Sequence, residues 1–264
     1  MKLKVGIFDS GIGGFTILNS LLKTRNDVEV FYLADTKRIP YGNKSFHEIR
    51  SIAKEICIFF EDKNLDALLI ACNTTNACAL DILGNNLKIP CFDLINSVSN
   101  MVNKKIIGVL ATQTTVNSSY YKNALSLKNQ NLKIFQQECP EFVSEIEKEK
   151  INFKKLNALS DLYLNPLMKK NIQELILGCS HYPLIYGLLR KKVNSNIRII
   201  DPSAALIKRF NEYFIIPKIE YYESISYENV KFFVTSEKDK FSKKLKIWLE
   251  INKEIKLVNL RSIV

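Results

Sequence analysis

Two segments of this chain repeat one pattern, and each ends an apolar run with a cysteine. Residues 68–75 read LLIACNTT and residues 175–182 read LILGCSHY, so Cys72 and Cys179 hold the same place in both. Asp93 and Asp201 follow them at nearly equal separations, each after another short apolar run. An apolar run that gives way to small polar residues is typical of a strand that leads into a helix of a parallel α/β sheet. The pattern therefore predicts two similar halves, with one thiol on each side of a shared cleft.

The rest of the chain alternates strand-like and helix-like segments. Apolar runs at residues 4–8 and 28–34 predict strands, and the apolar spacing over residues 49–60 predicts an amphipathic helix. The pattern restarts at residues 105–112. We therefore expect an α/β protein with two pseudo-symmetric domains, each a mostly parallel sheet flanked by helices, and an active site in the cleft between them.

The junction between the expected domains lies near residues 97–103, which divides the chain into residues 1–98 and 99–207. Ser203 is placed to cap a helix that runs through Phe210. A further strand at 232–235 and a final helix follow. The apolar side of that helix carries Phe241, Leu245, Trp248 and Leu249. The pattern alone assigns this tail to neither domain.

Composition narrows the class of protein. The chain has 264 residues, of which 47% are hydrophobic and 25% charged, as in ordinary globular proteins. It contains no apolar run of the roughly 18 residues that a membrane span needs, and its first residues do not resemble a signal peptide. We therefore expect a cytoplasmic protein without a membrane segment. The six cysteines form no C-x-x-C pair and there are only two histidines, so we expect free thiols and no metal site.

The formal net charge of +11 suggests a nucleic-acid surface at first sight. The lysine pairs are spread along the whole chain, however, which favours a generally basic surface over a binding stripe. We expect no nucleic-acid partner. A positive field would still help to attract an anionic substrate.

The loops around the two cysteines are suited to anions. Ser10, Thr112, Ser180 and the run Asn73-Thr74-Thr75 would present hydroxyl groups and backbone N–H groups at helix N-termini. A helix N-terminus also lowers the pKa of a thiol, so we expect Cys72 and Cys179 to be more acidic than ordinary cysteines. The loop at residues 9–14 is not the G-x-G-x-x-G fingerprint of nucleotide-binding folds.

As a set, these motifs resemble the glutamate racemases of the cofactor-independent aspartate/glutamate racemase superfamily. The resemblance runs from residue 4 to about 204 and is weaker in the tail. The matching segments, in the family's order, are FDSGIGG at 8–14, PYG at 40–42, ACNT at 71–74, CPEFV at 139–143 and GCSHYP at 178–183. The DSGxGG segment favours the glutamate branch over the aspartate branch. Three segments depart from the family pattern: Ser180 replaces a threonine, residues 111–115 alter a G-T-x-G-T loop, and residues 139–147 alter a CPxFVPLVE stretch. Glu147 falls on the family's functional glutamate, and Glu145 stands close to it.

The resemblance implies a mechanism without a cofactor or a metal. One cysteine removes the α-proton as thiolate and the other protonates the opposite face, with Cys72 acting on D-glutamate and Cys179 on L-glutamate. The resemblance further implies that Asp9 assists Cys72, whereas His181 and Glu147 assist Cys179, with Glu145 left open as an alternative to Glu147. The implied substrate-binding residues are Asp9, Ser10, Pro40, Tyr41, Gly42, Asn73, Thr74, Thr75, Thr112, Ser180 and His181.

The resemblance also implies a wider context for the protein. It implies a homodimer that supplies D-glutamate for peptidoglycan synthesis, and a tail at residues 208–264 that returns to the first domain. Two other functions compete with this one. A thiol hydrolase would use one Cys–His pair and leave the second half unexplained. A noncatalytic anion-binding or regulatory protein would account for the basic charge.

Overall fold

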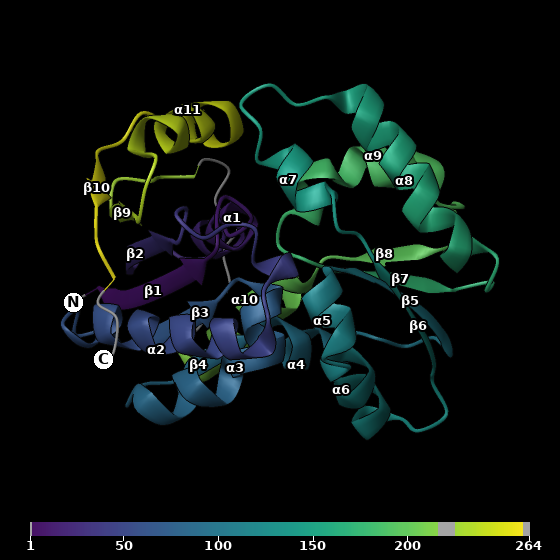
Figure 1. The fold of residues 1–264 in the computed structure, drawn as a ribbon. Coiled ribbons are helices and arrows are strands. Elements are labelled where there is room, and N and C mark those ends of the chain that lie inside the picture. The colour runs from purple at the N-terminus through teal and green to yellow at the C-terminus, as the bar shows by residue number, and fades with distance from the viewer. Residues whose placement is uncertain (1, 216–224, 261–264) are drawn as a thin grey trace.

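The computed structural model describes residues 2–215 and 225–260, and its described strands form two separate sheets. Parts of the expected tail, residues 216–224 and 261–264, lie outside the described residues. Every strand pairing is parallel, which confirms the expected mostly parallel sheets. Figure 1 shows the two sheets side by side, each with helices around it.

The first sheet has six strands in the order β10-β9-β2-β1-β3-β4. Their bounds are β1 (Leu3–Asp9), β2 (Val28–Ala34), β3 (Ala67–Ile70), β4 (Cys91–Asp93), β9 (Val230–Val234) and β10 (Ile255–Leu257). The last two come from the C-terminal part of the chain, and β9 pairs with β2. The tail thus adds two strands beside the N-terminal half.

The second sheet has four strands in the order β6-β5-β7-β8. They are β5 (Ile106–Ala111), β6 (Lys133–Glu138), β7 (Glu174–Gly178) and β8 (Arg198–Ile200). The restart of the pattern near residue 105 therefore marks the first strand of a new sheet. In both sheets the strand that precedes the cysteine, β3 or β7, lies next to the strand with which its half begins.

Helices cover both faces of each sheet. They are α1 (Phe15–Leu22), α2 (Phe46–Glu61), α3 (Asn73–Asn86), α4 (Leu94–Ser99), α5 (Gln113–Asn117), α6 (Tyr120–Lys128), α7 (Phe142–Ile146), α8 (Phe153–Met168), α9 (Tyr186–Lys192), α10 (Pro202–Tyr213) and α11 (Lys238–Leu249), with short 3₁₀ helices at Tyr41–Asn43 and Tyr182–Ile185. Successive residues of a strand point to opposite faces, so Leu69 of β3 packs with α1 whereas Leu68 and Ile70 pack with α2. Burial on both faces explains why the strands read as continuous apolar runs.

Helix α10 corrects one expectation about its own start. Its N-cap is Asp201 and not Ser203: the Asp201 carboxylate accepts a hydrogen bond from the Ser203 backbone N–H at 2.8 Å. Pro202 then occupies the first helical position, where its missing N–H costs nothing. The helix packs against α1 and α4, and the expected domain border at residues 207 and 208 falls inside it. The division of the chain into two domains stays a prediction.

Candidate active site

The two matched cysteines lie at the carboxyl ends of strands in different sheets. Cys72 follows β3 and is the N-cap of α3, and Cys179 follows β7. Both side chains are buried, and both line one small cavity of about 10 Å³. The other residues around this cavity are Ser10, Tyr41, Gly42, Asn73, Thr74, Thr112, Val143, Ser180 and His181. The fold thus brings one thiol from each sheet to a common space.

Four of the remaining candidates lie behind this lining, and one residue of the lining was missed. Asp9 accepts a hydrogen bond from the Ser180 hydroxyl at 2.9 Å, and Glu147 contacts His181. The Thr75 hydroxyl faces the Cys72 thiol, and Pro40 is the N-cap of the 3₁₀ helix that carries Tyr41 and Gly42. Val143 lies within the CPEFV segment, but an apolar side chain carries no chemical signal that would have singled it out.

Around Cys72 the dominant physical effect is burial. Burial, reinforced by the charge of Asp9, raises the pKa of the Cys72 thiol to about 12, although contacts with Thr75 oppose the shift. The expectation of a lowered pKa is therefore wrong for Cys72, because desolvation outweighs the helix N-terminus. Burial likewise raises the pKa of Asp9, whose carboxylate accepts from the Gly11 N–H and the Ser180 hydroxyl, both at 2.9 Å.

Cys179 has a different partner. The His181 Nδ1 atom lies 3.8 Å from the Cys179 sulfur, and the other ring nitrogen, Nε2, lies 2.7 Å from Oε1 of Glu147. Burial opposes charge on His181, but the hydrogen bonds to Cys179 and Glu147 win and raise its pKa well above the usual value. Burial also disfavours a charged Glu147, but His181 and Lys244 lower the pKa of that carboxyl to about 2. The arrangement is a buried carboxylate–imidazolium pair beside a sulfur.

The two neighbouring glutamates separate clearly in space. Oε1 of Glu145 accepts from the amines of Lys148 and Lys155, each at 2.7 Å. Glu147, at the C-terminal end of α7, turns toward His181 instead. The contacts therefore favour Glu147 over Glu145 as the partner of the histidine.

Donors for an anion surround the cavity. The Asn73 Oδ1 atom accepts from the Tyr121 hydroxyl at 2.7 Å, which fixes the side-chain amide. The opposite end of that amide, the buried Nδ2, has no hydrogen-bond partner within the part of the chain that the structure describes. The hydroxyls of Thr74 and Thr112 lie 2.9 Å apart and link the two halves. An unpaired buried donor at a helix N-terminus is suited to bind a carboxylate.

Tyr41 is held in the lining by residues that the sequence did not single out. Its hydroxyl donates to Asp35 at 2.5 Å, and the same carboxylate accepts from Arg38 at 2.6 Å and from Thr235 at 2.7 Å. Asp35 is fully buried directly after β2, just as Asp9 ends β1. This shared position at a strand end was the sequence signal that could have identified Asp35.

The glycines of the loop at residues 9–14 allow the two halves to approach closely. A Cβ atom at Gly11 would collide with Glu147 and Ile39, and one at Gly13 would collide with Ser180 and His181. No glycine among the described residues has a positive φ, so backbone conformation is not the reason for glycine here. The loop is a contact surface for the opposite half.

Residues 2–215 and 225–260 show neither a metal-binding cluster nor a membrane-spanning helix. Within those limits there is no group of three or more His, Cys, Asp and Glu side chains arranged to hold a metal ion. No helix there has the length and apolar character to cross a membrane.

Comparison with known proteins gives consistent matches. The model of the Asp/Glu/Hydantoin racemase family matches residues 17–210. A glutamate racemase of Prochlorococcus marinus (strain NATL1A) is 45% identical over 260 residues, which is 98% of each chain. The crystal structure of the Francisella tularensis glutamate racemase in complex with D-glutamate superposes with a TM-score of 0.89 at 34% identity, over 99% of each chain. An aspartate racemase of Picrophilus torridus shares the fold, with a TM-score of 0.60 at 19% identity over 87% of this chain and 98% of that one. From these matches and the geometry of the site, the chain belongs to the Asp/Glu/Hydantoin racemase family.

Proposed function

We propose that this protein interconverts L- and D-glutamate by proton transfer between the substrate α-carbon and two thiols, those of Cys72 and Cys179. The observation that carries the proposal is that both sulfurs line one buried cavity although they belong to different sheets. Glutamate racemases are also the relatives that match nearly the whole chain. A substrate held between the thiols would meet an acid on one face and a base on the other.

The different surroundings of the two cysteines support different roles for them. Burial raises the pKa of Cys72 to about 12, so this residue rests as a thiol, ready to donate. Beside Cys179, the Nδ1 atom of His181 lies 3.8 Å from the sulfur, and the hydrogen bonds to Cys179 and Glu147 raise the pKa of this imidazole. In this proposal, a thiolate at Cys179 with a thiol at Cys72 deprotonates the enantiomer that faces Cys179, which by the family resemblance is L-glutamate. After one turnover the states are reversed, and D-glutamate is the next substrate.

The α-proton of an amino acid is a weak acid, so binding must stabilise the carbanion. Donors at the N-terminus of α3, the Asn73 amide and the Thr112 hydroxyl are suited to the substrate carboxylates, where charge develops during the reaction. Burial of the site excludes water, which strengthens these interactions. Tyr41 and Gly42 also line the cavity.

Substrate entry requires the site to widen. A cavity of about 10 Å³ has room for about one water molecule, far less than glutamate needs. Contacts that cross between the sheets, such as that between Thr74 and Thr112, therefore break or lengthen when the substrate enters. In this proposal, the glycine loop also shifts relative to Ser180 and His181, which it contacts.

The wider role follows the same family. We propose a cytoplasmic homodimer that supplies D-glutamate for peptidoglycan, and hence for cell-wall biogenesis and cell shape. Neither alternative function is favoured by the matches: a thiol hydrolase would use Cys179 with His181 and leave Cys72 without a task, and an anion-binding protein would need neither thiol.

Deuterium exchange tests the proposed function directly. In heavy water, each enantiomer of glutamate is expected to acquire deuterium at the α-carbon as it racemises, because the proton delivered comes from a thiol that has equilibrated with solvent. Proton NMR and circular dichroism follow exchange and racemisation together, with no cofactor added. Racemisation that stops when pyridoxal phosphate or metal is carefully removed would contradict the two-thiol mechanism.

Substrate choice provides a second test. Glutamate is expected to exceed aspartate, alanine and glutamine in kcat/KM by about tenfold to a hundredfold, because a shorter or neutral side chain leaves a buried donor unpaired. The measurement compares both enantiomers of all four amino acids. Equal values for aspartate and glutamate would leave the racemase chemistry intact but overturn the glutamate assignment.

A further inference from the structure

Lys244 is the one lysine that is buried among the described residues, and its side chain is only 11% exposed. It lies on α11, three residues after Phe241, so helical spacing turns it toward the apolar side of that helix. A buried ammonium group is costly unless it is paired. The Lys244 amine is paired with Oε2 of Glu147.

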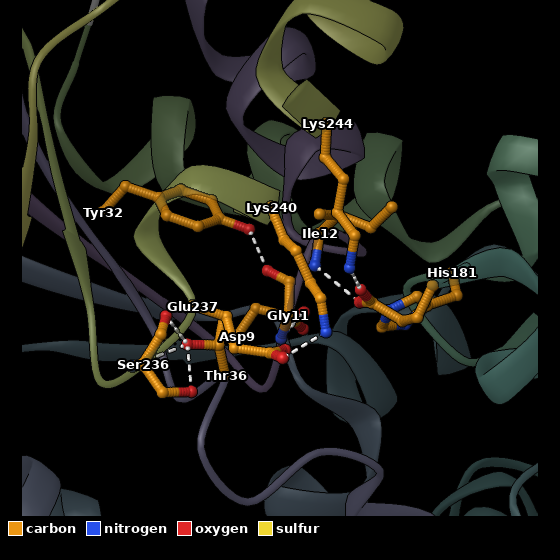
Figure 2. Close-up of polar contacts among 11 residues, drawn as sticks. Asp9, Gly11, Ile12, Tyr32, Thr36, His181, Ser236, Glu237, Lys240 and Lys244 are labelled. Atoms are coloured by element: carbon orange, nitrogen blue, oxygen red, sulfur yellow. Dashed lines mark hydrogen bonds and ion pairs between the residues drawn. The ribbon is translucent and has the colours of Figure 1, made fainter. Parts of the chain in front are cut away.

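The Glu147 carboxylate is held from three directions. Its Oε1 atom accepts from the Ile12 backbone N–H at 3.0 Å and lies 2.7 Å from His181 Nε2, whereas Oε2 takes the Lys244 amine. Lys244 contacts this carboxylate from α11, Ile12 from the glycine loop and His181 from the second half. Figure 2 shows Lys244, Ile12 and His181 close to one another. With Oε2 fixed by the lysine, Oε1 is turned toward the histidine.

These contacts form a chain that ends at one of the two thiols. The sequence of contacts is Lys244 to Glu147, Glu147 to His181 and His181 to the Cys179 sulfur. The partner that a histidine has at one nitrogen determines the proton state of the other. The surroundings of Cys72 are different, since Asp9 and Thr75 face that thiol.

We propose that Lys244 is a positioning residue for the half of the reaction that passes through Cys179. The proposal rests on the two-thiol function proposed above. Lys244 does not line the cavity between the thiols; it fixes Glu147, and through it the orientation and charge of His181. Loss of the amine leaves a buried carboxylate oxygen unpaired, weakens the support for the imidazolium, and so slows the proton transfers of Cys179.

The neighbouring lysine offers a matched control. Lys243 lies on the same helix and pairs with Glu149 at 3.0 Å, but its side chain is 61% exposed and that of Glu149 39% exposed. An exposed ion pair of this kind contributes little. Lys243→Met thus removes a lysine and an ion pair one position away without touching the chain to Cys179.

Isotope effects distinguish a role at one thiol from a general loss of structure. Lys244→Met, Lys244→Arg, Lys243→Met and wild type are compared with α-deuterated and unlabelled L- and D-glutamate. For Lys244→Met we expect kcat to fall about tenfold or more, with a much smaller change in KM. The deuterium isotope effect on kcat/KM should rise for the enantiomer that Cys179 deprotonates and fall for the other, because the Cys179 step limits both directions.

Lys244→Arg keeps a charged donor and is expected to restore most of kcat, and Lys243→Met to resemble wild type. A Lys244→Met variant that lowers both rates but leaves the ratio of the two isotope effects unchanged would overturn the proposal, since misfolding removes active enzyme without favouring one face. Normal kinetics in that variant would overturn it too. If the wild-type protein racemises neither enantiomer, the proposed function itself fails, so the two failures are distinguishable.

Discussion

Replacement of either Cys72 or Cys179 by alanine is expected to lower racemisation in both directions by at least about a thousand-fold. Each thiol is the acid or base for one face of the α-carbon, and every turnover uses both faces. Both variants should remain folded, because a thiol at a strand end contributes little core volume. Polarimetry on purified variants measures the activity, and thermal denaturation checks the fold.

The chain contains its own controls for these variants. Cys57 and Cys78 are also buried cysteines, but they pack in the apolar core around α2 and do not line the cavity. Cys57→Ala and Cys78→Ala should therefore leave kcat largely unchanged even where stability falls. Near wild-type racemisation in Cys72→Ala or Cys179→Ala would refute the two-thiol assignment.

Substitution of Gly13 by alanine is expected to lower kcat by about a hundredfold, although it adds a single methyl group. That methyl group would collide with Ser180 and His181, and a displacement of about 1 Å in a catalytic group costs on the order of 100-fold. The affected groups are the hydroxyl that donates to Asp9 and the ring beside Cys179. Steady-state kinetics in both directions measures the loss.

Gly187 is the matched control for this variant. It lies on α9, and a Cβ atom there would meet no atom within 4 Å. Gly187→Ala should therefore keep full activity and, as a Gly→Ala change within a helix, stabilise the protein slightly. A Gly13→Ala variant as active as Gly187→Ala would contradict the predicted collision with Ser180 and His181.

Much of the fold could be predicted because buried parallel strands appear in the sequence as continuous apolar runs. The apolar runs at residues 4–8, 28–34 and 68–71 coincide with β1, β2 and β3 to within a residue or two. Strand β6 was missed because it is an edge strand whose residues are only half buried. Its sequence, KIFQQE at residues 133–138, therefore has no continuous apolar run. The cap of α10 was misassigned because Asp201 and Ser203 are both good N-cap residues, and only the position of Pro202 separates them.

The part of the candidate site that lies at strand ends could be predicted from local sequence patterns. Cys72, Cys179 and their polar neighbours stand at strand ends, where the topology alone brings side chains together. The choice between Glu145 and Glu147 depends on which side of a short helix faces His181, and the lysines that hold Glu145 come from the turn after α7 and from α8. The direction of the Cys72 pKa shift depends on burial, which no local motif reports.

Lys244 was missed because local sequence does not report burial. In a helix with many lysines, each lysine is expected to be exposed to solvent. Its spacing from Phe241 and Trp248 was a usable signal, because all three fall on one side of α11. A charged residue on an otherwise apolar helical face needs a buried partner. The sequence, however, does not say which distant acid supplies it.

The strand order of the first sheet has a consequence for how the chain is made. Chains fold from the N-terminus as they leave the ribosome. The second sheet is contiguous in sequence and can close once β8 has emerged, whereas β2 keeps an open edge until β9 arrives. Lys244 reaches Glu147 later still, from the helix after β9. Ribosome-bound chains that end before α11 should therefore fold their second half and lack full racemase activity, so a nascent chain becomes fully active only after α11 has emerged.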